Sequence, residues 1–349
     1  MAGEGFRGGI TTPSAYALLT TIYLEGKGVP QNVPGAAEVI FKLFDIDDPK
    51  SIAPQLLTTM LDNYSHLGKD NSWVNKANYY IENRLKPGDR YAIGISYYAG
   101  IEMKEVNYEK ALFWFTDAVK HNEPGAYFFI GSMYTLGQGV SVDVDKAIYW
   151  HEKGVESGAT QSKLILAKLY QSKNTDQKKK QAFQLIKSEA DANNTFSYRM
   201  LANCYKEGRG VERSKEKALK YYILAAENGD DVSQNNVGYA YFSGEGQPKD
   251  YKKAFKWLSA SANQGQGNAA LTLSVQYLKG LGVEKNIKKA FYWSYVAFRT
   301  LDDKNMKKAA RQRMIRTGKF IGKAEGQITV KEAKRFLTTL QKSQFKGPG

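Results

Sequence analysis

One pattern recurs about every 36 residues along most of the chain, and it is the feature that most constrains the fold. Each copy has an alanine, usually preceded by lysine, and a large apolar or aromatic residue three positions later. Consecutive alanines are 34 to 40 residues apart. Such a period indicates stacked copies of one supersecondary unit. The pairs are Ala37/Ile40, Ala77/Tyr80, Ala111/Trp114, Ala147/Trp150, Ala182/Leu185, Ala218/Tyr221, Ala254/Trp257 and Ala290/Trp293.

Paired glycines run in phase with this pattern, each pair shortly after a segment of helical periodicity that contains a tyrosine. A glycine directly after a helix adopts the left-handed conformation that ends the helix without steric cost. Each unit therefore reads as helix, glycine turn, helix and short link. One such helix pair cannot bury its apolar face alone, so we expect an all-α solenoid of about eight antiparallel pairs. The glycine pairs begin at Gly26, Gly137, Gly208, Gly244 and Gly280.

The clearest unit contains Ala126 to Tyr134, then Gly137 to Val140, Asp143, Lys146-Ala147 and Trp150. This motif resembles the Sel-one-like repeat (SLR), a relative of the tetratricopeptide repeat. The resemblance covers about residues 14–300, with five strong units. It implies a right-handed superhelix that holds a protein or peptide on its concave face. The units at 46–88 and 159–193 depart from the pattern, the second because it lacks the glycines.

The predicted organisation has three parts. Residues 1–13 are expected to be a disordered N-terminus or one added for expression, and residues 301–349 a basic helical C-terminal cap. The solenoid between them is divided into units at about 14–45, 46–88, 89–124, 125–158, 159–193, 194–229, 230–265 and 266–300. The net charge is +15, with 50 Lys or Arg against 35 Asp or Glu, and the cap alone has 13 basic and four acidic residues.

Two helices are expected within the cap. Residues 304–316 space their apolar side chains at helical intervals, and Thr329 to Glu332 reads as a capping box that opens a last helix. A solenoid needs a terminal unit with a polar outer face, which explains the cap without a ligand. The alternative is that the basic segment docks an acidic partner.

Composition and motifs favour a protein without catalytic activity. The chain has one cysteine and three histidines, and the histidines lack metal-binding spacing, so neither a metal site nor a cofactor is expected. Cys204 occupies a mostly apolar repeat position, which predicts a buried thiol. The glycine pairs follow helices and lack a Gly-Lys-Ser/Thr ending, so we assign them to architecture and not to phosphate binding. No apolar run is long enough to span a membrane.

Nucleic acid is the weaker interpretation of the high charge. The aromatic residues lie mainly at repeat core positions and do not alternate with Arg and Lys as in a base-stacking surface. The excess charge also lies at one end of the chain.

The resemblance implies which side chains face a partner. In the related tetratricopeptide superhelix, first helices line the concave face, and fixed positions around the repeat tyrosine point into it. The alternative is that the apolar members of this set only pack against neighbouring helices. Carried onto this sequence, the predicted contact residues are Tyr91, Tyr98, Phe128, Ser132, Lys168, Gln171, Arg199, Asn203, Lys206, Asn235, Tyr239 and Phe242, with Ile95, Thr135, Leu164, Leu271, Val275 and Leu278 at equivalent positions.

The resulting hypothesis is a non-enzymatic scaffold that binds a protein or peptide, as a monomer or weak oligomer. From the resemblance, the sharper candidates are an immunity protein that neutralises a secreted toxin, or an adaptor of the bacterial envelope. The competing hypotheses are a hydrolase acting on cell-wall-like substrates and a basic-tail binder of nucleic acid or an acidic partner. The resemblance implies the bacterial periplasm, with the signal peptide removed, and the cytoplasm is the alternative.

Overall fold

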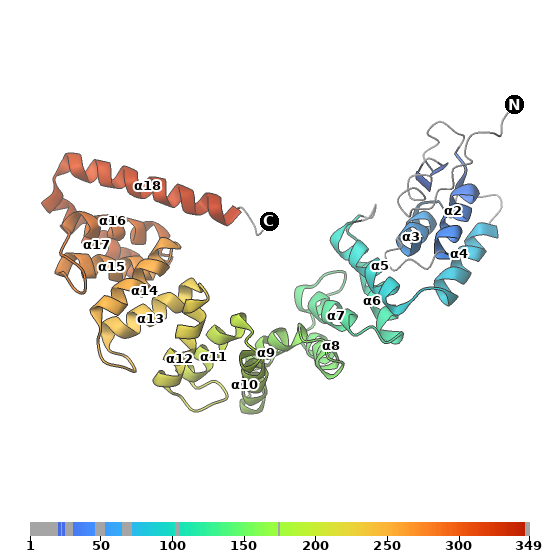
Figure 1. Cartoon of the computed structure of the whole chain (residues 1–349), viewed down its shortest axis with the longest axis horizontal. Coiled ribbons are helices and arrows are strands. Elements are labelled where there is room, and N and C mark those ends of the chain that lie inside the picture. The colour runs from blue at the N-terminus through green and yellow to red at the C-terminus, as the bar shows by residue number, and fades with distance from the viewer. Residues whose placement is uncertain are drawn as a thin grey trace. The chain divides into compact units, whose positions relative to one another are not determined.

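The computed structural model describes residues 20, 21, 23, 24, 31–45, 53–64, 72–101, 105–173 and 175–345. Within them the regular elements are helices, and consecutive helices pack as pairs, so the predicted all-α solenoid of helix pairs is confirmed (Figure 1). The predicted N-terminal segment 1–13 lies outside the described residues. The chain divides into two compact units, residues 1–169 and 170–349, which are described separately here.

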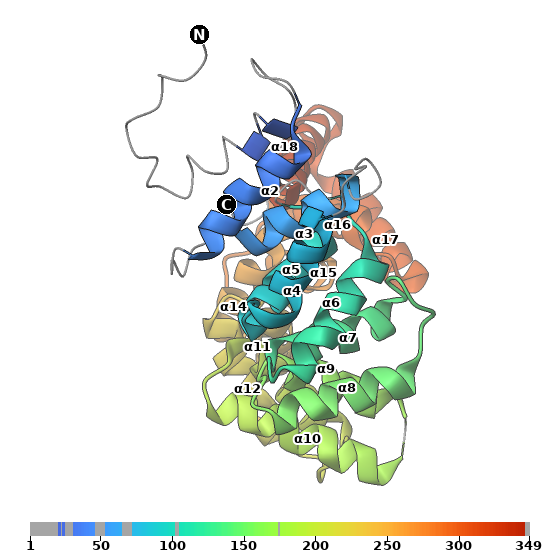
Figure 2. The ribbon, with the colours of Figure 1, turned by 90° about the vertical axis from the view of Figure 1, so that its right-hand side faces the viewer.

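The first unit contains three helices before the regular repeats begin and then two clear helix pairs. Figure 2 shows α5 to α8 as successive layers. Each helix of a clear pair packs most extensively against its partner. The helices are α2 (Val33–Asp45), α3 (Ala53–Tyr64), α4 (Ser72–Asn83), α5 (Pro87–Ala99), α6 (Tyr108–Lys120), α7 (Gly125–Leu136), α8 (Val144–Glu156) and most of α9 (Ser162–Ser172).

The second unit continues the pairs and ends in two long helices. Helix α10 has 16 residues where the other second helices from α6 to α14 have 13, so an extra helical turn follows the position where the glycines are missing. The helices are α10 (Asp176–Asp191), α11 (Thr195–Glu207), α12 (Lys215–Glu227), α13 (Asp231–Ser243), α14 (Tyr251–Asn263), α15 (Gly267–Lys279), α16 (Ile287–Thr300), α17 (Lys304–Ile321) and α18 (Lys323–Phe345).

In the four predicted glycine pairs that the structure describes, the first glycine ends a first helix, as predicted; the pair that begins at Gly26 lies outside the described residues. Gly137, Gly208, Gly244 and Gly280 have φ between 71° and 82° and donate their amides to a carbonyl in the last turn. This left-handed conformation strains any residue with a Cβ atom.

The second glycine of each pair has a different role, which the sequence alone did not reveal. A Cβ on Gly139 would lie 2.7 Å from the carbonyl carbon of Tyr108, the first residue of the preceding unit's second helix. Gly246 lies in the same way against Lys215, and Gly282 against Tyr251. The second glycine therefore permits close backbone contact between neighbouring repeats.

The lysine of the repeat pattern also acquires a structural role. In the unit of α11 and α12, the Ser214 side chain accepts from the amide of Lys217, and the Lys217 ammonium lies 5.5 Å from the centre of the Tyr205 ring. The amide of Ser214 in turn donates to the carbonyl of Tyr205. A helix cap and a cation–π contact thus join the two helices of one repeat. The same lysine–tyrosine contact recurs in the pairs Lys110/Tyr97, Lys146/Tyr134, Lys253/Tyr241 and Lys289/Tyr277. In the unit whose pattern position is Gln181, Lys178 lies over Tyr170 instead.

The repeat alanines lie at the centre of the helix packing, since all eight are at most 3% exposed. Small residues on the first helices serve the same purpose: a Cβ on Gly238 would lie 2.6 Å from Leu258 of the paired helix. Close approach of backbones and interdigitated large side chains account for the core.

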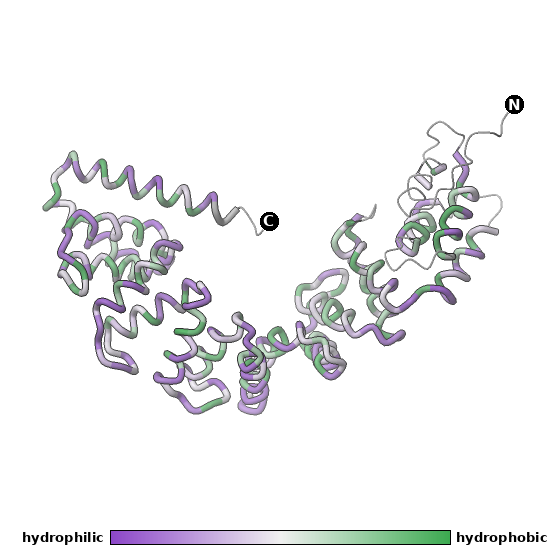
Figure 3. The backbone as a smooth tube through the Cα atoms, viewed as in Figure 1, coloured by the Kyte–Doolittle hydropathy of each residue, from purple (hydrophilic) through white to green (hydrophobic). Residues whose placement is uncertain are grey.

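The C-terminal segment folds as two helices that pack on α16, and Figure 3 shows hydrophobic and hydrophilic residues alternating along both. The expected start of the last helix at Thr329 is wrong, because α18 begins at Lys323. Thr329 is buried inside α18, and its hydroxyl donates to the carbonyl of Glu325. Gly322, with φ 75° and ψ 162°, breaks the chain direction between α17 and α18, so the helix start follows from that turn and not from a capping box.

Candidate protein-binding site

In the first unit, two of the predicted contact residues belong to an aromatic cluster. Tyr91 and Tyr98 of α5 are half-buried, and their ring centres lie 5.8 Å and 5.3 Å from that of Phe129 in the next first helix. Burial, together with the charge of Glu123, raises the pKa of Tyr91. The Tyr98 hydroxyl donates to Oε1 of Gln138. These rings join neighbouring repeats and present only part of their surface to solvent.

The other predicted residues of the first unit differ in exposure. Phe128 is half-buried with its ring centre 6.1 Å from that of His151, and Ser132 is buried. Thr135 donates its hydroxyl to the carbonyl of Gly131. Lys168 of α9 is exposed. Some of the residues expected to form one surface therefore pack against neighbouring helices, and others are exposed to solvent.

In the second unit, Gln171 of α9 and two residues of α11 take part in hydrogen bonds or ion pairs. The Gln171 amide nitrogen lies 3.6 Å from the sulfur of Cys204. Arg199 lies 3.5 Å from a carboxylate oxygen of Asp230, the residue that caps α13. Asn203 accepts from the hydroxyl of Tyr222. These contacts hold the polar side chains of α11 in defined positions.

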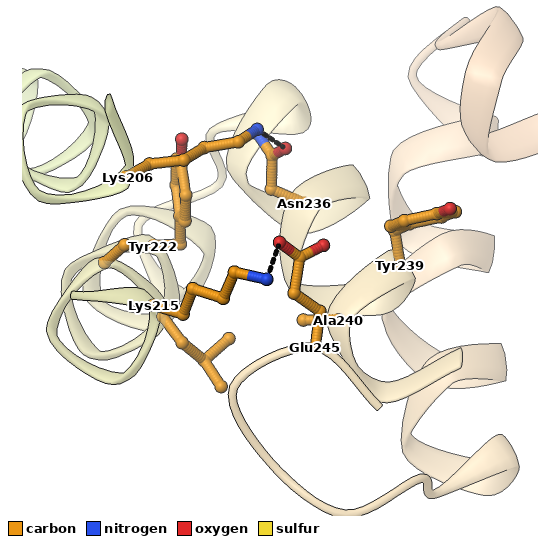
Figure 4. Close-up of a pocket in the computed structure, with 9 residues that line it drawn as sticks. Lys206, Lys215, Tyr222, Asn236, Tyr239, Ala240 and Glu245 are labelled. Atoms are coloured by element: carbon orange, nitrogen blue, oxygen red, sulfur yellow. Dashed lines mark hydrogen bonds and ion pairs between the residues drawn. The ribbon is translucent and has the colours of Figure 1, made fainter. Parts of the chain in front are cut away.

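A recess between α11, α12 and α13 brings predicted residues together with others that the sequence did not indicate (Figure 4). The Lys206 ammonium lies 3.4 Å from the side-chain oxygen of Asn236 and 5.9 Å from the centre of the Tyr222 ring. Tyr239, another predicted residue, lies at the edge of the recess and is 49% exposed.

The lining of the recess combines apolar and charged side chains. Ala218, Leu219 and Ala240 line it, and the Lys215 ammonium lies 3.1 Å from the carboxylate of Glu245. Burial raises the pKa of Tyr222 to about 12, so its hydroxyl stays protonated and donates to Asn203 at neutral pH. The recess can therefore accommodate an apolar side chain while lysine and amide groups bind a polar one.

Sequence reasoning did not identify four residues of this recess: Lys215, Tyr222, Asn236 and Glu245. Lys215 and Tyr222 belong to a second helix, whereas the predicted positions came from first helices only. Glu245 separates the two glycines of a turn, and its position follows from the contact of that turn with the preceding repeat. Repeat stacking is what brings these residues to Lys206.

Four further predicted residues lie on α13 and α15. Asn235 and Phe242 of α13 are half-buried, and Phe242 contacts the ring of Tyr251. Leu271 is buried in the core cluster of the second unit, and Leu278 packs against it. The burial of Leu271 favours the packing alternative for that residue, whereas half-buried Leu278 keeps part of its surface exposed.

Two candidate reactive groups are buried. Burial raises the pKa of the Cys204 thiol to about 11, as expected for a structural cysteine, and Cys204 is completely shielded from solvent. His151 is also completely buried, and burial lowers its pKa to about 4. Its Nδ1 lies 3.2 Å from the hydroxyl oxygen of Ser162, and a Cβ on Gly131 would lie 2.7 Å from its Nε2. Both side chains fill the interior of a repeat.

Comparison with known proteins matches the repeat pattern to one family. The family model described as Sel1 repeat matches residues 13–38, 90–122, 124–158, 195–230, 231–266 and 269–297, which together exceed half of the chain. No match was found among curated proteins. Among the described helices, none is both long and apolar enough to cross a membrane.

Solved structures give the same fold. A protective antigen of uropathogenic Escherichia coli that displays an SLR fold is 19% identical, with a TM-score of 0.52, and the match covers 97% of this chain and 80% of the antigen. A Sel1 repeat protein from Oxalobacter formigenes is 27% identical, with a TM-score of 0.52, over 75% of this chain and 96% of that protein. An immunity protein from Pseudomonas aeruginosa is 17% identical over 66% of this chain and 81% of its own, but its TM-score of 0.33 supports no further inference.

Proposed function

Because this chain belongs to the Sel1 repeat family, whose members are generally non-enzymatic scaffolds for protein–protein interaction, we propose that it binds a protein partner through the recess between α11, α12 and α13. The single observation that carries this proposal is the arrangement around Lys206. An exposed ammonium, an amide and a half-exposed tyrosine there surround an apolar floor.

The composition of the recess suits a peptide segment. Tyrosine beside a small apolar surface is typical of the side chains that contribute most to protein interfaces. Lys206 makes one long hydrogen bond, at 3.4 Å, so its ammonium has donors available for a carboxylate. We therefore expect the partner to place an acidic side chain near Lys206 and an apolar one against Leu219 and Tyr239.

Preformed geometry would contribute to the affinity. The side chains of Arg199, Asn203 and Tyr222 are already held by Asp230 or by each other. Binding then requires little further ordering of the protein, which reduces the entropy lost on association.

The test uses site-specific photo-crosslinking in the native host. A photoreactive phenylalanine at position 239 should give a defined crosslinked product, whereas the same group at exposed Lys256, on the second helix α14, should not. Recovery of that partner should fall strongly with Tyr239→Ala and with Lys206→Ala, since both residues line the recess. Undiminished recovery from both variants, with unchanged melting temperature, would show that the recess is not the binding site.

A sharper form of the proposal names the partner as a secreted toxin that this protein neutralises, or a component of the bacterial envelope. It rests only on the resemblance to repeat proteins with such roles. The crosslinked product distinguishes these two, because its mass and peptide sequence identify the partner directly.

A further inference from the structure

Three aromatic side chains of the first unit are exposed at the same repeat position. Tyr79, Phe113 and Tyr149 lie on the second helices α4, α6 and α8 and are 58%, 65% and 51% exposed. We call them the outer aromatic row. Each packs edge-on against the large ring that follows it in sequence, with ring centres 5.2–6.2 Å apart, in the pairs Tyr79/Tyr80, Phe113/Trp114 and Tyr149/Trp150.

The three helices that carry the row are attached to one core. Trp114 of α6 belongs to a cluster of buried residues, and Ile81 of α4 and Trp150 of α8 both pack against that cluster. The rings therefore belong to one continuous body, and each projects from it next to a residue that the core holds.

The fold does not require a ring at this position. In α10, α12 and α14 of the second unit the equivalent residues are Gln184, Lys220 and Lys256, which are exposed. The Lys256 ammonium lies 5.4 Å from the centre of the Trp257 ring, so a solvated cation covers the large ring equally well. Exposed rings repeated in register thus point to a contact surface.

The last repeat shows what covers a ring at this position. Tyr292, which precedes Trp293, is half-buried because the C-terminal helix α18 packs over it. The Phe336 ring centre of α18 lies 6.2 Å from that of Tyr292 and 5.9 Å from that of Trp293. Helix α18 is amphipathic: Val330, Ala333, Phe336 and Leu337 face the core, while Lys331, Lys334 and Arg335 are exposed.

Charge around the outer aromatic row favours a basic occupant. Glu109 lies one helical turn before Phe113, and Glu82 lies one turn after Tyr79, and both carboxylates are exposed. The lysine three residues before each ring is already paired with a carboxylate of the same chain, in the pairs Lys76/Glu38, Lys110/Asp62 and Lys146/Asp143. A helix of the α18 type would bring lysine and arginine to these carboxylates while its apolar face covers the rings.

We propose that the outer aromatic row docks a basic amphipathic helix of a protein partner, which presents an aromatic side chain to these rings as Phe336 does to Tyr292. The surface is on second helices of the first unit, whereas the recess around Lys206 is in the second unit. An experiment that rules out one of the two proposals therefore leaves the other unaffected.

The experiment uses a fluorescently labelled peptide with the sequence of residues 323–345 and the full-length protein. Fluorescence anisotropy should show saturable binding. Phe113→Ala combined with Tyr149→Ala should weaken it about tenfold or more, because two contact rings are lost. A peptide with Phe336→Ala should also bind more weakly, and Glu82→Gln with Glu109→Gln should reduce both the affinity and its salt dependence.

The matched control is Lys220→Ala combined with Lys256→Ala, which alters the same repeat position in the second unit and should leave the affinity unchanged. Melting temperatures of all variants should match, since the altered residues are exposed. Undetectable peptide binding, or equal affinity of the Phe113/Tyr149 double variant, overturns the proposal. Self-association of the protein that this double variant abolishes, measured by sedimentation, would assign the row to a second copy and overturn it as well.

Discussion

The backbone of Gly282, in the turn after α15, lies directly against the peptide group of Tyr251, the first residue of α14 in the preceding repeat. The φ angle of Gly282 is 70°, and that of Gly280, two residues earlier, is 71°. Both glycines adopt the left-handed conformation, but only the second leaves no room for a Cβ against the neighbouring repeat: at Gly280 the nearest atom would be 3.5 Å away.

Substituting these two glycines should therefore have unequal effects. We expect Gly280→Ala to cost about 1–2 kcal/mol from backbone strain. Gly282→Ala should add a steric cost of about 1–3 kcal/mol, because the peptide of Tyr251 cannot move without disturbing α14. Thermal unfolding followed by circular dichroism measures the difference. Equal melting temperatures for the two variants would contradict the assigned role of the second glycine.

Acidification should destabilise the protein partly through His151. Burial lowers its pKa to about 4 in the folded state, against 6.5 for an unperturbed histidine. The neutral form is favoured by folding, so this stability is fully present above pH 6.5 and is lost as the pH falls toward 4. The loss amounts to about 2 kcal/mol between pH 7 and 4.5.

Melting curves from pH 7 to 4.5 should thus be less pH-dependent for His151→Gln than for the unaltered protein. His121→Gln is the control, since His121 is exposed at the end of α6. If His151→Gln leaves the pH dependence unchanged, the buried neutral histidine is not the source of the acid sensitivity.

The Cys204 thiol should be unreactive in the folded protein. Its pKa is raised to about 11 by burial, and the thiolate is the reactive form. We expect slow alkylation by iodoacetamide at pH 8 in buffer and fast alkylation in denaturant, measured by mass spectrometry. Equal rates under both conditions would show that the thiol is accessible in the folded chain.

Removing α18 should expose the last repeat. Truncation after Gly322 takes away Phe336 and the fully buried Ala333, which cover Tyr292 and Trp293 of α16. The melting temperature should fall, and tryptophan emission should shift to longer wavelength because Trp293 becomes hydrated. Thr338→Ala, at an exposed position of α18, is the control. Unchanged melting and emission after truncation would show that α18 does not cap the repeat.

Local sequence patterns predict much of this fold. The helix-ending glycines, the buried alanines and the position of Cys204 all follow from rules that act within one or two helical turns. The start of α18 could not be predicted in this way. A Thr-x-x-Glu motif has the same appearance at a helix start and inside a helix, and the difference depends on the turn at Gly322 and on the burial of the Thr329 side chain within α18.

The candidate site was predictable only in part. The resemblance to tetratricopeptide repeats pointed to Lys206 and Tyr239, but the same reasoning included Leu271, which is buried in the core. Exposure along a helix depends on which neighbours cover it, and this information lies in other repeats.

By itself, the sequence determined that the chain is a stack of helix pairs, because a fixed period of glycine, alanine and aromatic residues leaves no other way to bury the apolar faces. Only the tertiary structure decided which of these residues serve packing and which meet solvent. Stacking brings Lys206 to Asn236 and places Phe336 over Tyr292, while Phe113 stays exposed. Such contacts join residues from different helices, and their geometry follows from how the repeats pack and not from any single segment.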